Sequence, residues 1–178
     1  MVKNLLFIGG KANSGKDVVA NYLIGKTTNH YSKLAFADSL KEFCSEKYNI
    51  PKYLFYTQLG KQSLYNKNIS LRDILIKEAA LKRYENEDYW IKQVAIKINN
   101  SKHNNIIISD FRYPNEYYNL RKYLNFKVSI KTIQVIRDLS YNIDDPSENS
   151  LNDFKFDIIL KNNESYKDLY NKIDLFIN

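Results

Sequence analysis

The stretch Gly10-Lys11-Ala12-Asn13-Ser14-Gly15-Lys16-Asp17 decides how this 178-residue chain is interpreted. It has the spacing G-x-x-x-x-G-K, and it joins an apolar segment, 3–9, to a segment with helical periodicity, 16–24. Glycines let the backbone turn tightly, so that its N–H groups converge on a phosphate, and a helix that begins at the lysine adds the positive end of its dipole. The sequence therefore predicts a phosphate-binding loop between a strand and a helix.

Two residues at the end of this loop carry its chemistry. Lys16 is expected to be catalytic, because its ammonium reaches the β- and γ-phosphates and follows the charge as it migrates. Asp17 stands where such loops usually have Ser or Thr for Mg²⁺; its carboxylate can hold the hydration shell of the metal, or it can cap the helix. The residues predicted to contact ATP are Gly10, Lys11, Ala12, Asn13, Ser14, Gly15, Lys16, Asp17 and Val18.

Strand and helix patterns alternate along the rest of the chain. The predicted strands are 3–9, 34–37, 105–109, 127–136 and 156–160. The predicted helices are 16–24, 39–48, one opened by Ser70, 89–98, 115–124 and 165–177, whereas 52–65 is ambiguous, with a helix followed by a loop around Asn66 and Asn68 expected. This alternation predicts an α/β domain with a mostly parallel five-stranded sheet flanked by helices, the three-layer fold of P-loop NTPases.

Composition limits the partners. The formal net charge is +7, but the lysines are dispersed without a basic run, so we expect no nucleic-acid partner; a positive field also suits phosphate substrates. No apolar run approaches the roughly 20 residues of a membrane helix, so we expect no membrane partner and a cytoplasmic location. The single cysteine, Cys44, is expected to be a small core residue. The oligomeric state stays open, with a homodimer as one option.

Arginine is scarce in this lysine-rich chain, so the positions that keep its bidentate fork are of interest. Arg72 and Arg83 are eleven residues apart, which places both on one face of an unbroken helix. They can grip the phosphate of an acceptor, or they can pair on the surface with Glu78, Glu85 or Glu87.

Acidic residues end two of the predicted strands, where parallel sheets bind ligands. Asp110 ends the strand 105–109 and can anchor the water shell of Mg²⁺ or cap the next turn, and Arg112 lies at the same edge. Asp38 ends the strand 34–37 and can face the acceptor or act as the N-cap of the next helix.

The polar segment 139–152 is predicted to be a mobile loop. Arg137 introduces it, where a kinase lid places an arginine to neutralise charge, and Glu148 lies within it; the predicted lid is about 137–152. Trp90 can stack on a base, although aromatics at helical spacing more often lie in the core.

Several of these residues stand in longer motifs. They are Ser14-Gly15-Lys16-Asp17, Phe36-Ala37-Asp38-Ser39-Leu40-Lys41-Glu42, Leu71-Arg72-Asp73-Ile74-Leu75 followed by Arg83 and Trp90, and Ser109-Asp110-Phe111-Arg112-Tyr113-Pro114-Asn115-Glu116. Together they resemble the motifs of the phage and viral deoxynucleoside monophosphate kinases, and the last is the most specific match. Val18 stands where these kinases often have threonine, and no histidine precedes Ser147-Glu148 in the lid segment.

The resemblance implies ATP-dependent phosphorylation of deoxynucleoside monophosphates to diphosphates with Mg²⁺, in a single kinase domain, 1–178, with an acceptor-binding helical region at about 38–100. The implied residues are Lys16, Arg112 and Arg137 for catalysis; Asp38, Lys41, Arg72, Arg83, Trp90, Asp110 and Arg112 for the acceptor; Asp17 and Asp110 for metal; and Arg137 and Glu148 for the lid. Two alternatives remain: another P-loop kinase with a phosphorylated acceptor, such as phosphomevalonate or dephospho-coenzyme A, and a nucleotide-dependent regulator or nucleic-acid-associated NTPase.

Overall fold

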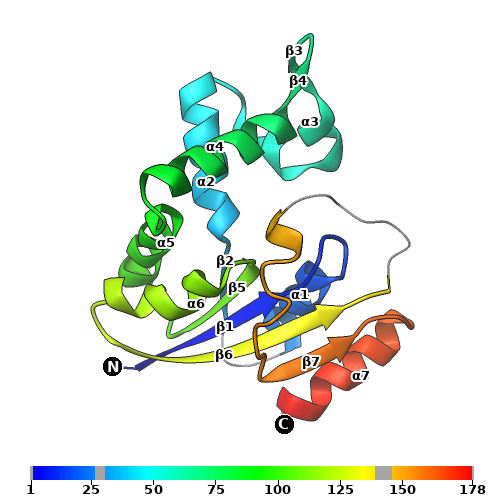
Figure 1. Ribbon diagram of the computed structural model, residues 1–178. Helices are drawn as coiled ribbons and strands as arrows, with labels where there is room; N and C mark the ends of the chain where they lie inside the picture. The colour runs from blue at the N-terminus through cyan, green and yellow to red at the C-terminus, as the bar shows by residue number, and fades with distance from the viewer. Residues whose placement is uncertain (1, 27–30, 139–145, 178) are drawn as a thin grey trace. The chain divides into compact units, whose positions relative to one another are not determined.

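The computed structural model describes residues 2–26, 31–138 and 146–177 (Figure 1). The chain forms two compact units: the first unit is Met1–Ala35 with Ala95–Asn178, and the second unit is Phe36–Val94. Within the described ranges, no helix has the length and apolar character that crossing a membrane requires.

The first unit is built on a five-stranded sheet. Its strands are β1 (Val2–Gly9), β2 (Ser32–Leu34), β5 (Asn105–Phe111), β6 (Lys127–Ile136) and β7 (Ile158–Lys161). They lie in the order β2-β5-β1-β6-β7, and each neighbouring pair is parallel. Leu5 of β1 is paired with Ile106 on one side and with Ile130 on the other, so the strand that leads into the phosphate loop is central. The predicted parallel α/β sheet is confirmed.

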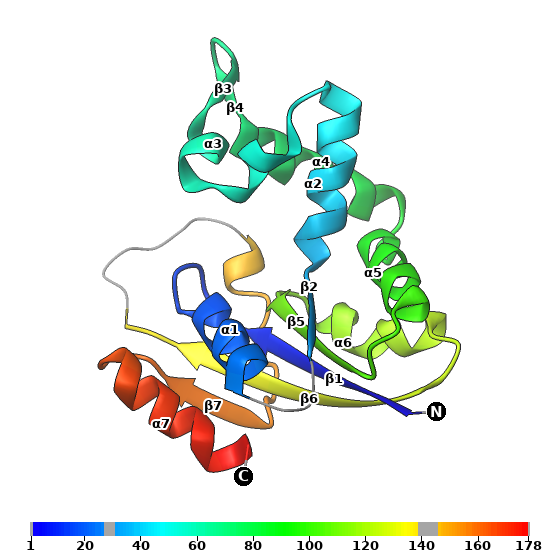
Figure 2. The same ribbon diagram turned by 180° about the vertical axis from the view of Figure 1, so that it is seen from behind.

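Helices cover both faces of this sheet (Figures 1 and 2). Helices α1 (Lys16–Lys26) and α7 (Tyr166–Ile177) share one hydrophobic core with the sheet, to which Ile8, Val19 and Ile173 contribute. Successive side chains of a strand point to opposite faces, so Phe7 lies on the other side from Ile8. There its ring contacts Tyr117 of α6 (Pro114–Leu120), at 6.3 Å between centroids. The predicted helix 115–124 is thus α6 followed by a 3₁₀ turn, Arg121–Tyr123.

The start of the second unit corrects one prediction. Strand β2 ends at Leu34, and α2 (Phe36–Tyr48) begins before Asp38, so Asp38 is not the N-cap of this helix. The reason is that Phe36, Leu40 and Cys44 are all buried, and their spacing of four residues matches one helical face. Asp38 instead lies in the first turn, where a carboxylate interacts favourably with the helix dipole.

The remaining elements of the second unit are short helices, two longer helices and a hairpin, and the two strands of the hairpin were not predicted. They are a 3₁₀ helix (Lys52–Tyr56), α3 (Gln58–Gln62), the hairpin of β3 (Leu64–Asn66) and β4 (Ile69–Ser70), α4 (Leu71–Glu85) and the start of α5 (Tyr89–Asn100). Ser70 caps α4 as predicted: its hydroxyl accepts the Asp73 N–H, and the Asp73 carboxylate accepts the Ser70 N–H. The ambiguous segment 52–65 therefore holds two short helices and the first strand of a hairpin.

An ion pair between a buried carboxylate and an exposed lysine joins α2 to α4. Glu78 is 1% exposed, and its carboxylate accepts hydrogen bonds from Lys47 at 2.8 Å and from the Tyr48 hydroxyl at 2.5 Å. Burial alone would raise the pKa of Glu78, but these two donors outweigh burial and lower it. The same hydrogen bond raises the pKa of Tyr48 to about 12. The charged residue that interrupts the apolar pattern of α4 is thus matched by partners on α2.

Candidate active site

The phosphate loop has no room for side chains at its two glycines. Gly10 has φ +140° and Gly15 has φ +104°, which side chains rarely adopt. A Cβ on Gly10 would lie 2.3 Å from the carbonyl oxygen of Val135, and a Cβ on Gly15 would lie 2.4 Å from Asn162 Nδ2. The predicted order of strand, tight loop and helix is confirmed, and both glycines are required by geometry.

Lys16 begins α1 and points back into this loop. The residue is only 9% exposed, and its ammonium donates hydrogen bonds to the carbonyl oxygens of Gly10 at 2.7 Å and Lys11 at 2.6 Å. Burial lowers the pKa of Lys16 to about 8. A bound phosphate would bring a full negative charge to this partly desolvated ammonium, whereas the two carbonyl oxygens carry only partial charges.

Charged residues from four segments of the first unit surround Lys16. Arg112 lowers its pKa further, whereas Glu148, Asp17 and Asp110 act in the opposite direction. Such influence requires that these side chains lie within electrostatic reach of the ammonium. The structure therefore brings together predicted residues of β5, the segment just after β5, α1 and the segment after β6.

The lowered pKa of Lys16 leads to a prediction about pH. A bound phosphate favours the ammonium form and raises this pKa, so nucleotide binding above pH 8 takes up a proton. With metal removed by EDTA, we expect affinity for ATP to fall as pH rises from about 8 to about 10. Calorimetry in buffers of different ionisation enthalpy at pH 7 and pH 9 measures the uptake. Equal proton uptake at both pH values would contradict the assignment.

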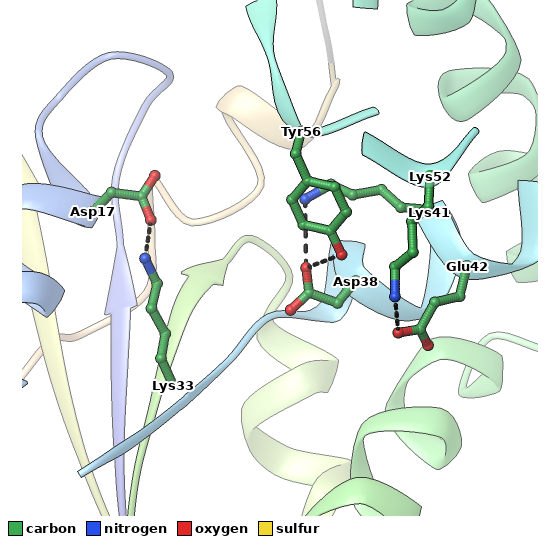
Figure 3. A network of polar contacts seen from close by, with 7 residues as sticks. All are labelled: Asp17, Lys33, Asp38, Lys41, Glu42, Lys52 and Tyr56. Atoms are coloured by element: carbon green, nitrogen blue, oxygen red, sulfur yellow. Dashed lines mark hydrogen bonds and ion pairs between the residues drawn. The ribbon is translucent and has the colours of Figure 1, made fainter. Parts of the chain in front are cut away.

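Asp17 faces another cation of the first unit. Lys33, on β2, donates a hydrogen bond to Asp17 Oδ1 at 2.7 Å (Figure 3). Partial desolvation raises the pKa of Asp17, but the hydrogen bond and charge of Lys33, together with Lys16 and Ser109, lower it overall. The carboxylate is therefore ionised at neutral pH, as a metal ligand must be.

These residues fit a magnesium ion held mainly by phosphate and water. Within the described ranges, no group of three His, Cys, Asp or Glu residues is placed to hold a metal ion. Mg²⁺ usually keeps several waters and takes one or two carboxylates plus substrate phosphates. Asp17 and Asp110 supply two carboxylates near Lys16, and the Ser14 hydroxyl is buried in the loop without a described hydrogen-bond partner. These residues therefore suit a magnesium site whose remaining ligands come from water and from the phosphates of the substrate.

Arg112 and Glu148 meet at the loop. Arg112 Nη1 donates to Ser147 Oγ at 2.8 Å and to Glu148 Oε1 at 2.5 Å. The other oxygen, Glu148 Oε2, accepts the backbone N–H of Ala12 at 2.5 Å. Of the predicted lid, 139–145 lie outside the described residues. Arg137 is exposed after β6, and with Glu148 it lines a pocket of about 210 Å³ that also borders Gly10.

Asn162 supports the loop and was not predicted. Its side chain donates to the Ser14 carbonyl oxygen at 2.8 Å, and its backbone N–H donates to the Ile136 carbonyl oxygen at 2.7 Å. Asn162 follows β7 directly, at the same end of the parallel strands as the loop. An asparagine at the end of a strand is a signal that could have identified it.

The second unit holds most of the predicted acceptor residues. Asp38 Oδ1 accepts hydrogen bonds from the Tyr56 hydroxyl at 3.1 Å and from Lys41 at 3.5 Å, and the Lys41 ammonium lies 4.0 Å from the centre of the Tyr56 ring (Figure 3). Tyr56 was not predicted as a site residue. Asp38 and Lys41 thus form one cluster with an aromatic side chain.

The other predicted residues of this unit differ in exposure. Arg72 and Arg83 lie on the unbroken helix α4, as predicted, and exposed Arg72 donates to Gln58 Oε1 at 3.0 Å. Trp90 is 3% exposed, and its indole N–H donates to the Ala79 carbonyl oxygen. Trp90 therefore lies in the core, as the alternative interpretation of this residue expected.

Comparison with known proteins establishes the fold. No family model matches the chain, and no curated protein matches it. Among solved structures, TT1252 from Thermus thermophilus is similar, with a TM-score of 0.53, 15% identity, and coverage of 99% of this chain and 97% of that one. A dephospho-CoA kinase from Campylobacter jejuni has a TM-score of 0.52, 14% identity, and coverage of 99% and 96%. A sugar kinase from Janibacter sp. HTCC2649 has a TM-score of 0.50, 11% identity, and coverage of 99% and 95%.

Proposed function

We propose that the protein transfers the γ-phosphoryl group of ATP to a deoxynucleoside monophosphate. The observation that carries this proposal is the glycine-lined loop with the buried ammonium of Lys16, around which Arg112, Asp17 and Asp110 gather. The motifs shared with the phage and viral deoxynucleoside monophosphate kinases supply the acceptor class, and the fold shared with solved kinases agrees with a phosphotransferase.

In the proposed reaction the protein supplies position and positive charge. Lys16 and Arg112 would neutralise the migrating phosphoryl group, and Arg137, which lines the pocket beside the loop, would add positive charge. Asp17 and Asp110 would hold Mg²⁺, which when bound would offset the negative charge of the phosphates. The attacking atom of the acceptor would be an oxygen of its phosphate group, which is already ionised at neutral pH, so no general base is needed to remove a proton.

The acceptor would be held by residues of the second unit. Arg72 and Arg83 share a face of α4 and offer two forks for a phosphate, and Asp38 with Lys41 offers an acceptor and a donor for sugar hydroxyls or phosphate. We leave Trp90 out of this set because it is buried.

One alternative has a specific observation in its favour. The solved dephospho-CoA kinase is similar in fold over 99% of this chain, and its name implies a phosphorylated acceptor. A phosphomevalonate acceptor belongs to the same class. Both alternatives keep every role that we assign to the loop and change only the acceptor.

A substrate panel separates these proposals. ADP release with Mg-ATP would be measured against deoxy- and ribonucleoside monophosphates, phosphomevalonate and dephospho-coenzyme A. Turnover with a deoxynucleoside monophosphate supports the main proposal. Turnover with dephospho-coenzyme A or phosphomevalonate alone replaces it with the alternative, and ATP binding without any turnover would favour a regulator.

The role of Arg72 predicts a selective defect. In Arg72→Lys, we expect the KM for the acceptor to rise about tenfold and the KM for ATP to change less than twofold, because lysine cannot make a bidentate phosphate contact. Arg121→Lys is the matched control, since exposed Arg121 packs on Tyr117 away from the loop. Steady-state kinetics measures both constants; an equal rise in the two would count against the assignment.

A further inference from the structure

The contacts of Glu148 tie a distant segment to the phosphate loop. Glu148 belongs to a short 3₁₀ turn, Pro146–Glu148, and its side chain is only 6% exposed. One carboxylate oxygen accepts the N–H of Ala12 and the other accepts the guanidinium of Arg112, both at 2.5 Å. Each oxygen of this carboxylate is thus used by a different part of the site.

Arg112 is anchored at both of its ends. Its backbone N–H donates to Glu116 Oε2 at 2.8 Å, and the Glu116 carboxylate is itself buried and accepts the N–H of Tyr113. Its guanidinium is held by Ser147 and Glu148. An arginine side chain carries about 2 kcal/mol of rotamer entropy, so without such anchors it would sample many orientations.

We propose that Glu148 is a positioning residue, which holds the Arg112 guanidinium at the rim of the phosphate loop. The hydrogen bond from the Ala12 N–H fixes the carboxylate, and the carboxylate in turn orients the guanidinium. The cation is therefore already in place when a phosphoryl group arrives. This inference rests on the proposed function, because it assigns Arg112 a role in phosphoryl transfer.

The chemistry of the side chain explains why a glutamate is needed. A carboxylate has two acceptor oxygens, whereas a glutamine amide has one acceptor oxygen and one donor nitrogen. In Glu148→Gln, either Ala12 or Arg112 therefore faces a donor instead of an acceptor, although the size of the side chain is unchanged. The hydrogen bond from Arg112 to the uncharged Ser147 hydroxyl would remain, but without the opposite charge of a carboxylate it would hold the guanidinium less strongly.

The first test separates rate from affinity. In Glu148→Gln, we expect kcat to fall about 10- to 100-fold and the affinity for an ATP analogue to change less than threefold, because misplacing a reacting group affects the transfer step. Glu46→Gln, on the exposed surface of α2, is the control and should match the wild-type protein. A rise in ATP affinity without loss of kcat would overturn the proposal, since Glu148 would then compete with the nucleotide.

The second test asks whether Glu148 acts through Arg112. In an Arg112→Lys background, adding Glu148→Gln should cost less than threefold in kcat, because the guanidinium to be positioned is already gone. Equal losses in both backgrounds would overturn the proposal and leave Glu148 with a role in folding alone. Thermal unfolding of each variant checks that the comparison is made between folded proteins.

A third readout needs no acceptor and keeps this inference separate from the proposed function. Resolved Nη–H signals of Arg112 in NMR spectra require slow rotation about its Cζ–Nη bonds, and we expect them in the wild-type protein and in Glu46→Gln. In Glu148→Gln, faster rotation about these bonds should average the Nη–H signals. If the signals behave so but no acceptor in the panel is phosphorylated, the proposed function fails while the contact stands. Unchanged signals in Glu148→Gln would overturn the positioning role.

Discussion

Replacing Lys16 with methionine is expected to lower kcat by about 10²- to 10³-fold, the size of effect seen when one preorganised donor is removed from a transition state. Methionine has a similar length and no charge, so it fills the same space without neutralising phosphate. The measurement is ADP release under saturating Mg-ATP with the best acceptor of the panel.

The same substitution should not destabilise the fold. Burial lowers the pKa of Lys16 to about 8, so the folded protein holds this proton less tightly than the unfolded chain does, and the charged lysine costs stability at neutral pH. We therefore expect Lys16→Met to unfold at the wild-type temperature or above it. The control is Lys26→Met in the same helix, where exposed Lys26 pairs with Asp174 at 3.2 Å and turnover should be unchanged. A folded Lys16→Met protein with wild-type turnover would remove the basis of the proposed function.

Replacing Gly10 with alanine is expected to abolish nucleotide binding and to cost about 2–4 kcal/mol in the free energy of unfolding. The backbone of Gly10 has φ +140°, and the added methyl group would lie 2.3 Å from the Val135 carbonyl oxygen on β6. Neither atom is the end of a flexible side chain, so relief requires a shift of the loop away from the strand. Denaturant unfolding and binding of a fluorescent ATP analogue measure the two effects.

Gly25 supplies the opposite control. It lies within α1, and a Cβ added there has no heavy atom within 4 Å. Gly25→Ala should therefore stabilise the protein by about 0.5–1 kcal/mol through the helix propensity of alanine. Equal losses of stability in the two variants would show that the strain at Gly10 is not what alanine disturbs.

Local patterns were enough to predict the sheet and the loop. The apolar runs of β1 and β5 and the phosphate loop are specified by neighbours in sequence, so no distant contact is needed to recognise them. The predicted start of α2 was wrong because every residue from Leu34 to Ala37 is apolar. Such a run fits the two-residue period of a strand and the roughly 3.6-residue period of a helix equally well. Only the burial of Leu40 and Cys44 decides that Phe36 belongs to a helix.

The supports of the site depend on contacts that local patterns do not contain. Glu148 lies 136 residues after Ala12, and Asn162 lies 148 residues after Ser14, and neither stands in a motif that names its partner. From the sequence, Glu78 only interrupts the apolar face of α4. Lys47 and Tyr48, which bind its carboxylate, lie on another helix. Residues that complete a charge or a hydrogen bond across the fold become visible only when the fold is known.

The central place of β1 in the sheet affects how the protein matures on the ribosome. This strand and the phosphate loop are synthesised well before β5, β6, Glu148 and Asn162, which all lie much further along the chain. Pairing over such long stretches of chain is entropically costly and slow. The growing polypeptide therefore carries its phosphate loop without strand partners until β5 and β6 have been made, and without the Asn162 contact until β7 has followed.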